Sequence, residues 1–160
     1  MGEFLWRSVV LGVAATALLD IWALFLQRAF GIAPPNWAMV GRWVGHLPQG
    51  TFVHADIGKA APVTSELAIG WVFHYAVGIV FAAALLAIWG LGWAHAPTFV
   101  PALIVGYVTI GCGWFILQPG MGAGIAAVKR PNAMQIRALN VLGHTVFALG
   151  LYGAALLVRP

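Results

Sequence analysis

Four long apolar stretches constrain this chain more than any other feature of its sequence. They cover about residues 8–30, 67–91, 98–117 and 136–158. A helix that crosses a bilayer needs roughly 20 mainly apolar residues, and each stretch reaches that length. Only 8% of the residues are charged and 62% are hydrophobic, whereas a soluble domain carries about 25% charged residues. We therefore predict an all-α integral membrane protein, a four-transmembrane-helix bundle that forms a single membrane domain over residues 1–160.

The longest connection, residues 31–66, has a helical pattern of its own. Apolar residues recur at helical spacing from Trp37 onward, and Asn36 before them can cap a helix. The indole rings and Arg42 in this segment suit the boundary between lipid and water. We predict one short interfacial helix at about residues 36–47.

The positions of the lysines and arginines predict an orientation, because cationic residues are enriched in cytoplasmic loops. Arg7 and Arg159 lie on one side of the predicted spans. The other six lie on the opposite side: Arg28, Arg42, Lys59, Lys129, Arg130 and Arg137. We expect the two larger loops to be cytoplasmic and both termini to lie outside. The cations form no stripe interleaved with aromatics, so we expect no nucleic-acid partner.

Three titratable side chains lie well inside the predicted spans. Asp20 is in the first span, His74 in the second and His144 in the fourth. At 1.5 Å of rise per residue, they lie about 10 to 15 Å from the cytoplasmic ends of their spans. Ionisable groups at this depth are costly, and they normally face the interior of a bundle. We therefore predict a buried polar cluster centred on these three residues.

Smaller polar residues support this cluster. Thr16 and Gln27 share a helical face with Asp20, and Asn140 lies one turn before His144. Cys112, the one cysteine, lies at a similar depth in the third span. We expect Cys112 to be a small buried residue, as free cysteines commonly are.

The cluster leaves three roles open. Its members can simply satisfy one another by hydrogen bonds, aided by Tyr75. Alternatively, the two histidines can ligate a haem b iron, or a transition metal with Asp20 as third ligand. A third possibility is a path for protons or a substrate through the carboxylate and the imidazoles. We find no nucleophile–base arrangement, so we expect no catalytic residues and no enzyme.

A second group of potential ligands lies in the long connection. His46, His54 and Asp56 carry imidazole and carboxylate donors close together in the sequence. They are candidate metal ligands near the cytoplasmic end of the cluster. The simpler interpretation is that they are solvated loop side chains.

A chain-long set of motifs resembles a known family. The motif residues are Thr16, Asp20, Asn36-Trp37, Gly41-Arg42-Trp43, Gly45-His46, Phe52, His54, Gly70-Trp71, His74-Tyr75 and Gln118-Pro119-Gly120-Met121-Gly122. The pattern resembles the small bacterial inner-membrane family known as domain of unknown function 2938. The resemblance implies four membrane helices and a bacterial origin, with both termini then periplasmic. It implies no established activity and supplies no catalytic residues.

These observations lead to two functional hypotheses. In the first, the protein is a multi-pass inner-membrane protein whose buried His/Asp cluster binds a haem or metal or relays protons. In the second, it is a non-catalytic accessory or structural subunit of a larger membrane complex. The expected partners are the lipid bilayer and either further copies of the chain or that larger complex.

Overall fold

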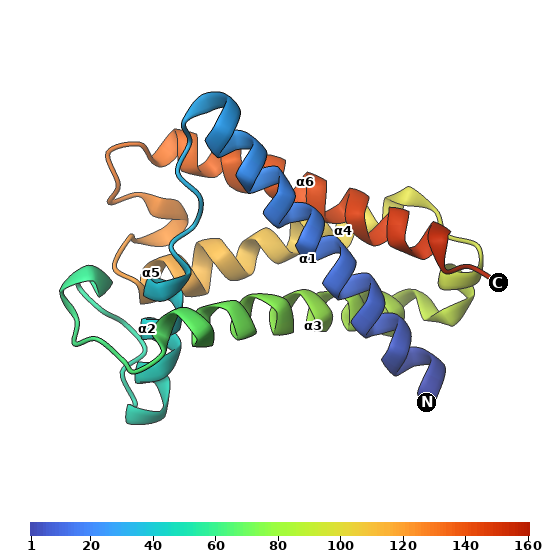
Figure 1. The fold of residues 1–160 in the computed structure, drawn as a ribbon, viewed down its shortest axis with the longest axis horizontal. Helices are drawn as coiled ribbons and strands as arrows, with labels where there is room; N and C mark the ends of the chain where they lie inside the picture. The colour runs from blue at the N-terminus through green and yellow to red at the C-terminus, as the bar shows by residue number, and fades with distance from the viewer. The chain divides into compact units, whose positions relative to one another are not determined.

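The computed structural model describes residues 1–160, and every regular element of the chain is a helix, with no strand (Figure 1). Four helical segments are long and apolar enough to cross a membrane. They are α1 (Gly2–Phe30), α3 (Glu66–His95), the segment Phe99–Gly120 that begins with α4 (Phe99–Cys112), and α6 (Ala133–Leu157). The prediction of an all-α protein with four apolar helices of spanning length is confirmed.

The first helix begins earlier than the apolar stretch in the sequence suggests. Helix α1 starts at Gly2, whereas the sequence predicts a start near residue 8. The polar residues at its beginning have partners within the protein. Arg7 donates from Nε to Glu3 Oε1 at 2.8 Å, and from Nη1 to the carbonyl of Val158 at 3.0 Å. Because these contacts neutralise the polar first turns, the helix continues through them.

Two spans contain departures from regular α geometry. In α3, Gly90 has φ 77° and ψ 170°, which only glycine adopts easily and which kinks the helix. In the third span, α4 passes into a π-helix, η3 (Gly113–Leu117), and then into the short α5 (Gln118–Gly120). The amide of Gln118 bonds the carbonyl of Gly113, five residues back. The third span therefore continues three residues beyond the predicted end near residue 117.

The connections contain short helices. The predicted helix of the long connection is present as α2 (Trp37–His46), and the side chain of Asn36 caps it by accepting from the amide of Met39. The remaining elements are single 3-10 turns: η1 (Leu47–Gln49), η2 (Ile57–Lys59) and η4 (Ile125–Ala127).

The contacts divide the chain into two compact units. The bundle unit comprises Met1–Pro34, Tyr75–Thr109 and Val141–Pro160. The loop unit comprises Pro35–His74 and Ile110–Asn140. The core of the bundle unit is formed by side chains of α1, α3, α4 and α6: Leu11, Ala15, Ala82, Leu85, Leu86, Trp93, Ala94, Ala102, Val105, Phe147, Leu151, Ala154 and Ala155.

Helices in the bundle unit approach one another at small residues. A Cβ added to Gly12 of α1 would lie 2.5 Å from Ile79 Cα in α3, and one added to Gly150 of α6 would lie 2.6 Å from Ala15 Cα in α1. Real Cβ atoms do not come so close to backbone atoms. Close packing of small residues is the usual means of helix association in lipid, where apolar side chains gain little from leaving the solvent.

The loop unit is organised by Arg42. Its guanidinium forms a two-pronged ion pair with Glu66, through Nε and Nη2, each at 2.8 Å. Its Nη1 points at the carbonyls of Ile57, Gly58 and Ala60 at 3.3, 3.4 and 3.1 Å. The hydrogen bonds to the Glu66 carboxylate raise the pKa of Arg42 above its ordinary value. One side chain thus holds η2 to α2 and to the first residue of α3.

Helices α2 and α3 are in direct backbone contact within the loop unit (Figure 1). A Cβ on Gly41 would overlap the carbonyl of Glu66, and a Cβ on Gly70 would overlap the carbonyl of Trp37. This contact positions the aromatic and imidazole side chains of α2 against the beginning of α3.

Candidate functional site

Asp20, the one acidic residue in the middle of an apolar helix, is paired with a tyrosine. The hydroxyl of Tyr75 in α3 donates to Asp20 Oδ2 at 2.9 Å. Both side chains are half-buried, and both belong to the bundle unit. A hydrogen bond from a hydroxyl offsets part of the cost of a carboxylate in an apolar setting.

The helical face before Asp20 is buried as predicted, whereas the face after it is not. Thr16 is 1% exposed, and its Oγ1 has no hydrogen-bond partner. This oxygen lies against Gly78 of α3, where a Cβ would overlap it. Gln27, two turns beyond Asp20, is exposed. The polar face of α1 therefore contacts α3 as far as Asp20 and then leaves the interior.

His144 in α6 is anchored to the backbone of α4. Its Nδ1 lies 2.8 Å from the carbonyl of Gly106 and 3.3 Å from Thr109 Oγ1. A carbonyl oxygen only accepts, so Nδ1 carries the proton and Nε2 keeps its lone pair. The small residue at Gly106 allows this approach, because an added Cβ there would lie 2.9 Å from the His144 carbonyl.

His74 belongs to the loop unit and is enclosed by tryptophans. Its ring stacks on Trp37 of α2 with a centroid separation of 3.9 Å and an angle of 27°. Trp71, one turn earlier in α3, meets the ring edge-on at 5.9 Å. Asp20 and His144 belong to the bundle unit. The convergence of His74 with those two residues stays a prediction.

His46 and His54 form a hydrogen-bonded pair in the loop unit. His46 Nδ1 lies 2.8 Å from His54 Nε2, and the two rings are stacked at 5.0 Å. His54 Nδ1 lies 3.1 Å from the carbonyl of Gly120. Because that carbonyl only accepts, His54 carries its proton on Nδ1, and in the neutral state its Nε2 accepts from His46 Nδ1–H. The pair is therefore oriented, with the lone pair of His46 at Nε2.

The third member of that candidate metal group has a local role. Asp56 Oδ1 accepts from the amide of Gly58 at 2.9 Å and so caps η2. No group of three or more His, Cys, Asp or Glu side chains in the structure converges in a way that could hold a metal ion. The structure thus brings His46 and His54 together as a pair.

Asn140 is a hydrogen-bond acceptor for two side chains of the third span. Its Oδ1 accepts from Trp114 Nε1 and from Gln118 Nε2, each at 2.9 Å. The other end of that amide, Gln118 Oε1, is buried without a partner. These three residues lie within the loop unit, where they tie the π-helix and α5 to the beginning of α6.

The exposure of Cys112 contradicts one prediction from the sequence. Cys112 is exposed at the end of α4, so the prediction that it is buried in the protein is wrong. A small apolar side chain is equally well accommodated by lipid and by protein, and an apolar sequence does not distinguish the two surroundings.

A comparison with known protein families identifies the family of this chain. The profile of a family described as "Protein of unknown function (DUF2938)" matches residues 9–158. The chain belongs to this family. The resemblance noted in the sequence motifs is therefore confirmed over nearly the whole chain. A search of curated proteins and a search of solved structures each found no match.

Sequence reasoning missed two arrangements in this DUF2938 chain. One is the ion pair between Arg42 and Glu66, which are 24 residues apart. The chain has only four acidic residues, so an acid at the start of an apolar stretch was a usable signal for a partner. The other is the pairing of Asn140 with Trp114 and Gln118, which depends on the π-helix and has no signal in the sequence.

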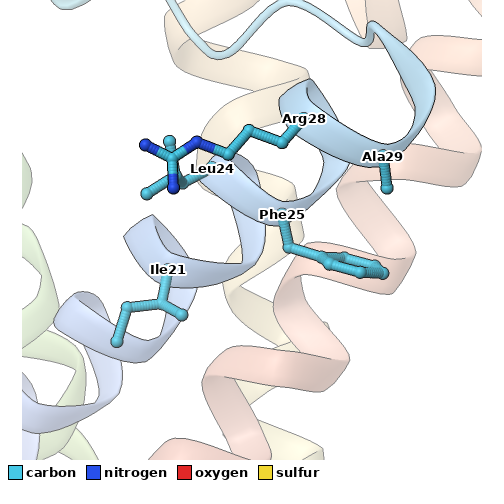
Figure 2. A pocket seen from close by; sticks show the side chains of 5 residues that line it. All are labelled: Ile21, Leu24, Phe25, Arg28 and Ala29. Carbon is cyan, nitrogen blue, oxygen red and sulfur yellow. The ribbon is translucent and has the colours of Figure 1, made fainter.

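The last turns of α1 carry a surface that the bundle unit does not cover. A hollow of about 400 Å³ is lined there by Ile21, Leu24, Phe25, Arg28 and Ala29. Figure 2 shows these side chains on the helix, with Phe25 pointing to a different side from Arg28. Ile21 and Phe25 are 62% and 50% exposed, and lipid or another protein must cover them.

Proposed function

We propose that this DUF2938 protein relays protons in a bacterial inner membrane, with Asp20 as the proton carrier of the bundle unit. The observation that carries the proposal is the hydrogen bond of 2.9 Å from Tyr75 to Asp20. It joins two helices that are long and apolar enough to cross a membrane. Carboxylates at such positions are rare, and in membrane proteins they commonly mark ion or proton pathways.

The oriented histidine pair supports the same role. A proton that arrives at His46 Nε2 makes that ring cationic, and His46 can then pass its Nδ1 proton to His54 Nε2 across 2.8 Å. His54 is then the cation, with both nitrogens donating, to His46 and to the Gly120 carbonyl. The transfer between the two rings moves one proton along an existing hydrogen bond, so neither ring has to move. The Gly120 carbonyl is no proton acceptor, so His54 releases the proton by the reverse transfer.

The charge distribution supports an orientation for this relay. The cationic residues of the loop unit include Arg42, Lys59 and Arg130, whereas the bundle unit has Arg7 and Arg159 at the two ends of the chain and Arg28 in the last turn of α1. Under the positive-inside rule the two larger loops are cytoplasmic and both termini are periplasmic. In the proposal the His46–His54 pair exchanges protons with the cytoplasm, and His74 and His144 are the predicted partners of Asp20.

Proton flux into proteoliposomes tests the proposal. A potassium gradient with valinomycin drives protons inward, and a trapped pH-sensitive dye reports the acidification. We expect the wild type to accelerate acidification and Asp20→Asn to return it to the leak of protein-free vesicles. Tyr75→Phe keeps the carboxylate and loses its hydroxyl partner, so we expect a severalfold reduction.

Glu3→Gln is the matched control, because it removes a carboxylate of the same helix at its N-terminal end. We expect its flux to equal that of the wild type. Size-exclusion chromatography establishes that every variant remains folded. A wild type that conducts no more than empty vesicles, or a folded Asp20→Asn variant with full flux, contradicts the proposal.

A cofactor role is a second candidate, favoured by the geometry of His144. Metal-ligating histidines commonly donate one ring nitrogen to a carbonyl and present the other to the metal. His144 donates from Nδ1 to Gly106 and keeps the Nε2 lone pair. Elemental mass spectrometry and haem absorbance of the purified protein test this role. Near-stoichiometric metal in the wild type that is lost in both His144→Ala and His74→Ala would establish it.

The accessory-subunit hypothesis is favoured by the uncovered end of α1. The side chains that line the hollow, Leu24 and Arg28 among them, lie on the last turns of α1 (Figure 2), where another helix could pack. A cysteine crosslink introduced at Ile21, in a variant without Cys112, tests this idea in native membranes. A single crosslinked product of defined mass supports an assembly, and its absence at several exposed positions of α1 contradicts it.

A further inference from the structure

The loop unit contains a hollow of about 480 Å³. We propose that it binds the headgroup of a phospholipid that carries both a phosphate and a primary amine. This site is distinct from the proton relay, and it involves neither Asp20 nor the His46–His54 pair. The volume lies in the range of ordinary small-molecule sites, about 300–1,000 Å³.

The wall of this hollow is mainly apolar and comes from segments far apart in the sequence. The apolar lining residues are Pro35, Met39, Val40, Ile57, Leu117, Met121 and Ile136. Such a wall suits the glycerol and the first methylenes of a lipid. A soluble phosphate ester would leave most of this surface unused.

Two opposite charges complete the lining. Asp56 and Arg130 both border the hollow. Asp56 uses one carboxylate oxygen, Oδ1, to cap the amide of Gly58, and its other oxygen has no hydrogen bond. The Arg130 side chain is exposed, and its guanidinium makes no hydrogen bond or ion pair. A carboxylate oxygen and a guanidinium are therefore both available to a ligand.

The position of the hollow along the spans matches the depth of lipid headgroups. Leu117 lies near the end of the span Phe99–Gly120, and Ile136 lies near the start of the span Ala133–Leu157. Residues at the ends of two spans lie at the boundary between hydrocarbon and water. The third wall is α2, the helix whose tryptophans suit the same boundary.

The charges select the class of headgroup. A phosphate is matched by the planar guanidinium of Arg130, and an ammonium with N–H donors is matched by Asp56. A phosphatidylethanolamine offers both groups. A phosphatidylcholine has no N–H donor for Asp56, and a phosphatidylglycerol has no cation. We therefore infer the preference phosphatidylethanolamine over phosphatidylcholine over phosphatidylglycerol.

Native mass spectrometry of the full chain, delipidated in a mild detergent, tests this preference. The three lipids are added singly with matched acyl chains, and the bound fractions are compared. For the wild type we expect phosphatidylethanolamine to bind about fivefold more tightly than phosphatidylglycerol, the factor that corresponds to about 1 kcal/mol. Free phosphoethanolamine serves as a competitor that lacks the acyl chains.

Three variants locate the site. Asp56→Asn keeps an oxygen to cap Gly58, so we expect a folded protein that has lost its preference for phosphatidylethanolamine. Arg130→Gln should weaken all three phospholipids. Lys129→Gln removes the neighbouring charge, which does not line the hollow, and should bind as the wild type does.

Three outcomes contradict the lipid-binding proposal. Equal binding of the three lipids by the wild type excludes a site that distinguishes one headgroup from another. Equal loss in Lys129→Gln and Arg130→Gln means that only net charge is sensed. Displacement of the lipid by millimolar phosphoethanolamine means that the hollow serves a soluble ligand. A proton flux that fails in vesicles leaves this binding result unaffected, so the two proposals fail separately.

Discussion

The bundle unit and the loop unit are stabilised in different ways. In the bundle unit, helices contact one another through Gly12, Gly106 and Gly150, and few polar side chains lie between them. In the loop unit, short helices and turns are joined by side chains that bond backbone carbonyls, above all Arg42. Regular helices satisfy their own backbone, whereas irregular segments near a membrane need side-chain donors. The irregular backbone of the loop unit therefore depends on a charged side chain, Arg42, for several of its hydrogen bonds.

Removal of the central arginine should disrupt the loop unit most strongly. Arg42→Gln leaves Glu66 without its two-pronged partner and three carbonyls without their shared donor. We expect hydrogen exchange and proteolysis to increase sharply over Pro35–His74, while the bundle unit stays protected. Arg42→Lys should not restore protection, because an ammonium lacks the planar fork. Unchanged hydrogen exchange in Arg42→Gln would contradict the role of Arg42 in the loop unit. Arg28→Gln, at an exposed arginine, is the control.

A methyl group at a helix contact should damage the bundle unit next most. Gly12→Ala places a Cβ 2.5 Å from Ile79 Cα, and rigid backbone cannot yield there. We expect a loss of about 3 kcal/mol in unfolding titrations, the upper part of the range for overpacking. Gly153→Ala is the matched control, since its Cβ meets nothing within 4 Å. It should gain up to about 1 kcal/mol from helix propensity. Equal effects of the two substitutions would contradict the packing argument.

Loss of the amide acceptor in the third span should cost less. Asn140→Leu leaves the Trp114 and Gln118 donors unpaired. We expect a destabilisation of about 1–2 kcal/mol, since each hydrogen bond in a membrane contributes about 1 kcal/mol or less. The exposed Asn132→Ala should have almost no effect in the same titration. A neutral Asn140→Leu would show that these hydrogen bonds do not stabilise the π-helix.

The proton positions in the His46–His54 pair can be measured by spectroscopy without any substitution. Nitrogen-15 spectra of histidine-labelled protein, recorded where imidazoles are neutral, should show protonated Nδ1 in both His46 and His54. His95 in the bundle unit bonds Glu3 through Nε2 at 2.6 Å and should show the opposite tautomer. An Nε2–H signal for neutral His54 would contradict the direction of the proton relay.

The sequence predicts this fold well because hydropathy and helical spacing are local properties. The four apolar helices, the short helix α2 and its cap at Asn36 follow from them. The kink at Gly90 and the left-handed conformations of Ser65, Ala126 and Ala127 do not. The three non-glycine residues adopt a conformation that their residue types rarely take, so no local rule predicts it.

Individual residues of the candidate site could be predicted from the sequence, but the contacts between them could not. Sequence reasoning identified Asp20 and the loop histidines, because polar groups are conspicuous in an apolar chain. It named Tyr75 as an aid to the cluster but not as the donor to Asp20. It also did not reveal that His46 contacts His54 while Asp56 caps a turn. Such pairings depend on helix rotation and loop geometry, which no spacing rule fixes. The exposure of Cys112 was hidden for the same reason.

The π-helix at Gly113–Leu117 has a consequence for how the chain can vary in length. A π turn holds one residue more than the α turn it replaces, so it behaves as an accommodated insertion. Deletion of a single residue there would convert the wide turn into a regular α turn and leave the helix on either side close to its present register. A further inserted residue has no such turn to absorb it and would rotate Gln118 away from Asn140 by about 100°. This segment should therefore tolerate a one-residue deletion, or substitution of its exposed residues Phe115 and Ile116, far better than an insertion.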